Sequence, residues 1–181
     1  MMMSPRLGKF VLTTHVAFSV GWLGAVAVFL ILGVVALTSQ SAQLVRSAYL
    51  VMEPAAWFTL VPLSLGSLIT GLVQSLGTRW GLVRHYWVLF KLLINVFAST
   101  VLLAYTQTLG FFAAAAAGAT GPVGDLGVLR SPSVVIHASG ALVLLLVATT
   151  LSVYKPKGMT RYGQRKQSEQ RARRDRAMSS L

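Results

Sequence analysis

Apolar residues occur in four long runs and do not alternate with polar ones. The first run covers residues 10–37 and contains no Lys, Arg, Asp or Glu. The other three cover residues 49–76, 86–109 and 133–154. Because about 20 mainly apolar residues are enough for a helix to cross a membrane, each run is long enough to span it. The pattern predicts an all-α fold, an integral membrane bundle of four helices in up-down antiparallel order.

The segments between these runs predict where the helices end. The first run is far longer than the roughly 7–15 apolar residues of a cleaved secretory signal, so it is expected to remain in the mature chain. An alanine run after residue 109 is able to extend the third helix, but Gly118, Gly121, Pro122 and Gly124 follow and favour a break.

Composition supports a membrane location. Of the 181 residues, 55% are hydrophobic and only 11% are charged, whereas a soluble domain carries about 25% charged residues. The chain has too few charges to cover a water-facing surface, which excludes an ordinary soluble globular domain. The absence of cysteine excludes disulfides, thiolate metal sites and iron–sulfur clusters.

The net charge of +12 indicates an orientation. Two basic residues, Arg6 and Lys9, precede the first run, and two, Arg79 and Arg84, separate the second from the third. Nine more follow the fourth run, while the two remaining connections hold one arginine each, Arg46 and Arg130. Since Lys and Arg accumulate on the cytoplasmic side, residues 1–9 and 155–181 are both expected in the cytoplasm, and the protein in the plasma membrane.

The tail, residues 155–181, is polar and basic. It holds nine basic and two acidic residues, which is seven units of the net charge. We expect it to be disordered, or a helix induced by a partner. Anionic lipid is the expected partner, although the charge also fits a purely topogenic role. Nucleic acid is not expected, because Tyr162 is the tail's only residue for base stacking. The lipid-binding candidates are Arg165, Lys166, Arg171, Arg173, Arg174 and Arg176.

Four titratable residues lie within the predicted spans, where such groups are costly and indicate functional sites. Counting residues along each helix places His15 and Lys91 at the same depth near the inner face. The same count places Glu53 and His137 near the outer face. Structural roles remain open: Lys91 can extend to the headgroups, Glu53 precedes a proline suited to a first helical turn, and His15 can be a packing residue.

Several of these residues occur in an order that resembles known families over about residues 10–105. His15 lies seven residues before Trp22, Met52 and Glu53 begin the second span, and Trp87 is four residues before Lys91. This order resembles HemJ-type protoporphyrinogen oxidases and the CopD group of copper-associated membrane proteins. Overall the chain resembles a family of small bacterial four-helix membrane proteins of unknown activity.

The HemJ resemblance implies a bundle that binds haem b or a porphyrin. It places His15, Lys91, Trp22 and Trp87 at the cofactor. Alanines and a proline replace the basic residues that follow Met-Glu in that family, so oxidase activity is not predicted.

The CopD resemblance implies an alternative, a metal-handling or transport accessory, although no confident set of metal ligands is present. A scaffold acting through its tail is the third hypothesis. A homo-oligomer or a larger membrane complex stays open.

Overall fold

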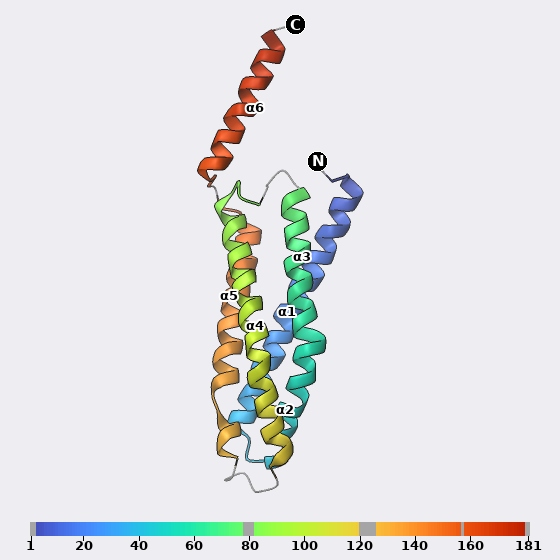
Figure 1. Ribbon diagram of the computed structural model, residues 1–181, viewed down its shortest axis with the longest axis vertical. Helices are drawn as coiled ribbons and strands as arrows, with labels where there is room; N and C mark the ends of the chain where they lie inside the picture. Colours follow the sequence, from blue (N-terminus) through green and yellow to red (C-terminus); the bar gives the residue numbers. More distant parts are fainter. Residues whose placement is uncertain (1–2, 78–81, 120–125, 157, 180–181) are drawn as a thin grey trace.

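The chain is all-helical in the part that the structure describes, which confirms the all-α part of the prediction. The computed structural model describes all residues except 1–2, 78–81, 120–125, 157 and 180–181 (Figure 1). Four of its helical segments are long and apolar enough to cross a membrane. Arg79, Gly121, Pro122, Gly124 and the side chain of Arg174, which entered the predictions above, lie outside the described residues.

Helices α1 (Pro5–Thr38) and α5 (Ser133–Tyr154) correspond to the first and fourth apolar runs. Ser4 caps the start of α1, where its hydroxyl accepts a hydrogen bond from the Leu7 N–H at 3.4 Å. Helix α5 ends at Lys155, which adopts a left-handed conformation with φ 43°. This conformation stops the helical repeat and turns the chain toward the tail.

The second apolar run is part of a longer helical segment, made of α2 (Ala42–Ala55), a π-helical turn (Ala56–Leu60) and α3 (Val61–Gly77). The expectation that Glu53 and Pro54 start a helix is wrong, since Pro54 lies inside α2. The helix begins earlier, after Ser41, which is twelve residues before Glu53. The Ser41 hydroxyl caps it by accepting a hydrogen bond from the Leu44 N–H. Pro54 has no N–H to donate, so the regular pattern of backbone hydrogen bonds is interrupted there. The π turn, which begins two residues later, accommodates this interruption.

Helix α4 (Tyr86–Gly118) includes the alanine run and ends at the first glycine after it. A 3₁₀ turn (Gly127–Arg130) leads into α5. The tail forms a helix, α6 (Arg161–Ser179), where the sequence indicated disorder or an induced helix. A hydrogen bond links the start of α6 to the segment before α4. The hydroxyl of Thr160, which directly precedes α6, donates to the Val83 carbonyl at 2.6 Å.

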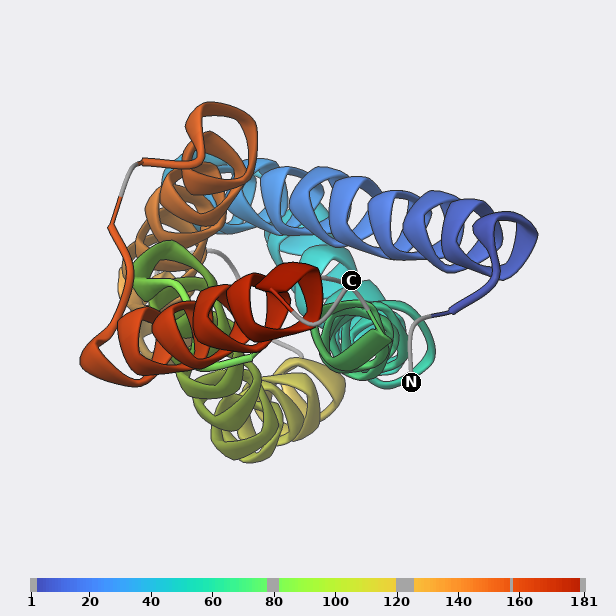
Figure 2. The ribbon, with the colours of Figure 1, turned by 90° about the horizontal axis from the view of Figure 1, so that it is seen from above.

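The long helices lie side by side, and α6 extends past one end of them (Figure 1). Helix α1 contacts α3 and α5, and α4 contacts α2, α3 and α5. Both chain ends lie at the end where α3 stops and α4 starts, opposite the α1–α2 connection (Figure 1). Seen from above, α1 slants away from the other helices toward its N-terminal end (Figure 2).

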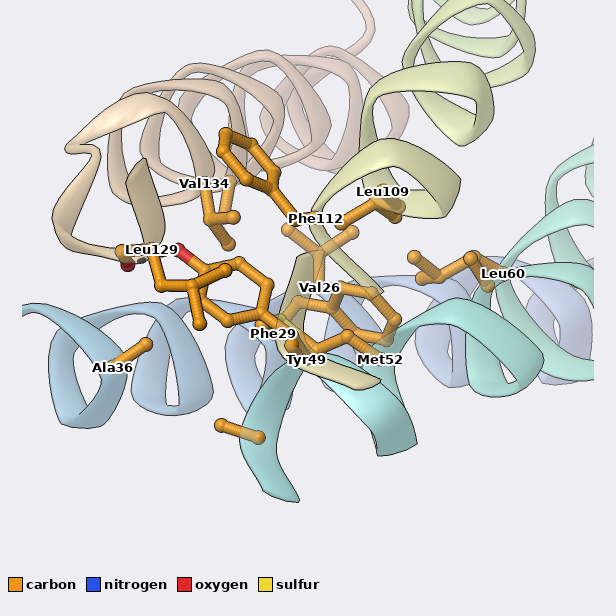
Figure 3. Close-up of a cluster of buried hydrophobic side chains, with 14 of the residues drawn as sticks. Val26, Phe29, Ala36, Tyr49, Met52, Leu60, Leu109, Phe112, Leu129 and Val134 are labelled. Atoms are coloured by element: carbon orange, nitrogen blue, oxygen red, sulfur yellow. Dashed lines mark hydrogen bonds between the residues drawn. The ribbon is translucent and has the colours of Figure 1, made fainter. Parts of the chain in front are cut away.

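The apolar core lies in the half of the molecule away from the chain ends. It joins the C-terminal halves of α1 and α4 to α2 and the start of α5 (Figure 3). Tyr49 and Phe112 pack against each other in this core, with their ring centroids 5.1 Å apart. The Tyr49 hydroxyl donates to the Leu129 carbonyl at 2.8 Å. The half that carries the chain ends contains most of the polar side chains described next.

Candidate functional site

His15 packs against α3 through a hydrogen-bonded ring nitrogen. Its Nδ1 lies 3.1 Å from the Ser67 carbonyl oxygen and 3.1 Å from Thr70 Oγ1. The carbonyl can only accept, and the Thr70 hydroxyl already donates to the Gly66 carbonyl at 2.6 Å. Nδ1 must therefore carry the proton and donate to both. In the neutral imidazole this leaves Nε2 with the free lone pair, which is the arrangement of a histidine that serves as a ligand.

A chain of hydroxyl and amide groups extends from His15 to α4. Ser67 is 2% exposed, and its Oγ lies 2.8 Å from Ser19 Oγ on α1. The Asn95 amide Nδ2 on α4 donates to the same Ser67 oxygen at 3.4 Å. Three helices thus meet at one buried serine. This polar cluster, His15, Ser19, Ser67, Thr70 and Asn95, ties α1, α3 and α4 together inside the apolar segments.

Two atoms beside the cluster have no hydrogen-bond partner among the described residues. They are Asn95 Oδ1 and Ser99 Oγ, and Ser99 is 3% exposed. Leaving a buried polar group unpaired costs about 1–3 kcal/mol. Since Asn95 and Ser99 are one helical turn apart on α4, the two atoms mark one face of that helix as polar and unsatisfied.

Gly71 permits the close approach of His15 to α3. A Cβ at this position would stand 3.0 Å from the His15 Cε1 atom, which is nearer than ordinary carbon contacts of about 3.5–4.0 Å. The glycine therefore sets the distance between the imidazole and the helix that orients it.

Lys91 lies near His15 but is directed to a different partner. Its charge is close enough to act on the His15 ring, although no hydrogen bond joins the two side chains in the described part of the protein. Its Nζ lies over the Trp87 ring, 5.7 Å from the centroid, a cation–π distance. Trp87 is buried, and its ring is 6.4 Å from that of His85. The expected inner pair therefore shares a region without a hydrogen bond between the two side chains in the described part of the protein.

The expected outer pair is not brought together. Among the described residues, no hydrogen bond or ion pair joins Glu53 to His137. His137 instead stacks on Tyr105 of α4, with ring centroids 4.1 Å apart and planes inclined by 22°. Its Nδ1 is 2.8 Å from the carbonyl of Ser133 one turn earlier, so it donates there and leaves Nε2 as an acceptor.

His137 and Tyr105 line a cavity of about 240 Å³ between α4 and α5. Helix α1 contributes to its wall, including Trp22, which is 2% exposed. His15 is not among its lining residues. Trp22 and His15, expected at one cofactor, thus belong to different places in the bundle.

His15 has the donor chemistry that a haem iron requires. A neutral imidazole nitrogen is a standard axial ligand, and the Ser67 carbonyl fixes the tautomer that leaves Nε2 available. The cavity adds no support for haem, because His137 and not His15 lines it. The residues therefore fit haem b through the ligand chemistry of His15 alone. No cluster of three or more His, Cys, Asp or Glu side chains suited to a metal occurs among the described residues.

Four members of this region were not predicted as site residues from the sequence: Ser19, Ser67, Thr70 and Ser99. A signal was present for two of them. Ser19 follows His15 by four residues, and Ser99 continues the four-residue spacing of Lys91 and Asn95, which places each on the same helix face as its predecessor. Thr70 had no such signal, because it meets His15 only through packing between helices.

Comparison with known proteins adds no assignment. No family model, no curated protein and no solved structure matches this chain. Any functional proposal therefore rests on the residues and on the geometry given above.

Proposed function

We propose that the protein is an integral membrane protein with four spans in up-down antiparallel order and both ends in the cytoplasm. The side chains directed away from the helix contacts support this, since large apolar residues such as Phe10, Phe58 and Phe97 are 60–83% exposed. Only 11–28% of the residues in each apolar window are buried. So much exposed apolar surface is unfavourable in water and suits lipid.

The natural absence of cysteine makes this topology testable with single-cysteine variants. Gln40→Cys lies in the α1–α2 connection and Ser168→Cys in α6. A membrane-impermeant maleimide applied to intact cells is expected to label Gln40→Cys at once, and Ser168→Cys only after lysis. Protection of Gln40→Cys in intact cells, with labelling of Ser168→Cys, would reverse the proposed orientation.

We further propose that the function of the bundle centres on His15, as the residue that binds haem b or a related iron porphyrin. One observation carries the proposal: the Nδ1 hydrogen is directed onto the Ser67 carbonyl at 3.1 Å, which leaves Nε2 as the ligand nitrogen. Lys91 would supply a positive charge near the site for a porphyrin carboxylate. The haem itself would supply reversible one-electron chemistry, tuned by its axial ligand and its surroundings.

The absorption spectrum tests this proposal directly. Protein purified in detergent from cells supplied with haem is expected to show a Soret band. His15→Ala should lose the band, whereas the matched variant His137→Ala should keep it. A wild-type preparation without a Soret band would overturn the proposal, as would an unchanged band in His15→Ala.

A second role, binding of anionic lipid, is supported by α6. Its basic side chains Arg165, Arg171, Arg173 and Arg176 are all exposed. Each basic residue near a charged bilayer surface contributes about 1 kcal/mol. Replacing these four residues by glutamine should reduce the amount of phosphatidylglycerol that copurifies with the protein, relative to a variant with four exposed neutral residues replaced. Equal amounts of copurified phosphatidylglycerol in the two variants would contradict lipid binding and would indicate that α6 only sets the orientation of the protein. A cation-handling role has less support, because the described residues offer no cluster of metal ligands.

A further inference from the structure

The cavity between α4 and α5 is separate from the polar cluster around His15 and has its own chemistry. Its volume is about 240 Å³. Apolar side chains from α1, α4 and α5 form nearly all of its wall. The wall includes Trp22 of α1, Tyr105 of α4, and His137 and Ala141 of α5.

Part of the cavity wall lies on the exposed side of the bundle. Phe97 of α4 and Ile136 of α5 are part of its wall and are 60% and 63% exposed. Both lie within the apolar segments, so in a membrane their exposed faces meet lipid. A molecule that enters between them must therefore be dissolved in the bilayer.

The size of the cavity limits what it can hold. An apolar cavity of about 150 Å³ binds one benzene molecule, so this one accommodates a single substituted ring. Sites for larger, drug-sized ligands occupy about 300–1,000 Å³. A porphyrin, with four pyrrole rings, exceeds the space available. The space therefore suits a one-ring molecule with an apolar substituent that extends into lipid.

The imidazole of His137 gives the wall a hydrogen-bond acceptor. His137 Nδ1 donates to the Ser133 carbonyl at 2.8 Å, so the neutral ring has its acceptor at Nε2. The Tyr105 hydroxyl lies 3.0 Å from Ser133 Oγ, and its ring stacks on the imidazole at 4.1 Å. Ser133 thus holds both rings in place. The part of the wall described here offers an acceptor to a ligand that brings its own donor.

We propose that this cavity binds the ring of a membrane-soluble hydroxyaromatic molecule of the quinol class, whose hydroxyl donates to His137 Nε2. The stacked Tyr105 and His137 rings and the buried indole of Trp22 give the ring aromatic neighbours. The proposal is independent of haem binding at His15, which lies outside the cavity.

A matched pair of ligands tests the hydrogen bond. Equilibrium dialysis in detergent measures the dissociation constants of a radiolabelled short-chain alkylhydroquinone and of its dimethyl ether. The ether has the same ring but no donor. We expect the wild type to bind the hydroquinone about tenfold more tightly, the size of one hydrogen bond. Equal affinity for the two would overturn the proposal in favour of a cavity that accepts any apolar molecule.

Three variants locate the binding. His137→Phe keeps an aromatic ring for stacking but removes the acceptor, and it should bind both compounds with the affinity of the ether. Ala141→Leu fills the cavity and should abolish both. His15→Ala should bind the hydroquinone as the wild type does, even where it loses a Soret band, so the two proposals fail separately. Far-ultraviolet circular dichroism checks that each variant is folded, and hydroquinone discrimination that survives in His137→Phe would refute the assigned role of His137.

Discussion

Replacing Gly71 by alanine tests whether α3 holds the His15 ring in its orientation. A Cβ at this position would stand 3.0 Å from His15 Cε1 and 3.4 Å from Nδ1. Carbon atoms in ordinary contact are about 3.5 Å apart or more, so the ring has to withdraw by roughly 0.5 Å. That movement lengthens the 3.1 Å contacts of Nδ1 with Ser67 and Thr70 toward the limit of an effective hydrogen bond.

Two opposing contributions set the expected magnitude. Loss of the hydrogen bond costs about 0.5–1.5 kcal/mol, whereas alanine in place of glycine stabilises a helix by about 1 kcal/mol. At Gly24 and Gly140 a Cβ would meet no atom within 4 Å, so only the second contribution operates there. We expect Gly71→Ala to be less stable than Gly24→Ala and Gly140→Ala by about 1 kcal/mol.

Two measurements check this. Unfolding in mixed micelles of increasing dodecyl sulfate content, followed by far-ultraviolet circular dichroism, gives the difference in unfolding free energy between the variants. Nitrogen-15 NMR of labelled histidine reports whether Nδ1 still carries the proton. If Gly71→Ala matches both glycine controls in stability and leaves the histidine tautomer unchanged, then the contact at Gly71 does not hold the ring in place. A wild-type ring that carries its proton on Nε2 would refute the assignment of Nε2 as the ligand atom.

Three further predictions concern buried or half-buried polar groups. Arg130 donates to two backbone carbonyls at the end of α1, at 2.7 and 2.6 Å. Arg130→Gln should lower the unfolding free energy by about 1–3 kcal/mol. Arg130→Lys should recover only part of this loss, because lysine lacks the planar pair of donors that arginine has. Tyr49→Phe leaves the buried Leu129 carbonyl without its donor and should cost about 1–3 kcal/mol by chemical unfolding; no loss would mean that another group satisfies the carbonyl. Ser99→Ala removes a buried hydroxyl without a partner among the described residues, so thermal unfolding should show equal or higher stability, and clear destabilisation would indicate that the hydroxyl binds water or a ligand.

The sequence by itself determined the all-helical class and the four apolar segments. The length and hydropathy of the runs were sufficient. An apolar run long enough to cross a bilayer has to satisfy its backbone hydrogen bonds internally, and a helix does so. It also identified His15, Lys91 and His137 as the residues to examine, since titratable groups are rare within such runs. The predicted third span ended at residue 109, whereas α4 continues through the alanine run to Gly118, an extension that the sequence left open.

Local rules failed where a cap competed with a proline. Pro54 suggested a helix start, but Ser41 began the helix earlier and the π turn accommodated the proline. Both signals were present in the sequence. The packing of α2 against α1 and α4 favoured the cap over the proline as the helix start. This packing buries Val45, Ala48 and Tyr49, which precede Pro54 in the helix.

Only the tertiary structure decided which side chains meet. Counting residues gives the depth of a group along its helix, but it does not give the direction in which the group points. The long helices are mostly apolar, and short polar rows such as Lys91, Asn95 and Ser99 on α4 do not show which neighbouring helix they face. Packing therefore placed His15 against Ser67 and Thr70 of α3, and His137 against Tyr105 beside a cavity. Depth is a property of one helix and can be read from its residues, whereas the partners of a side chain depend on how neighbouring helices rotate and interlock.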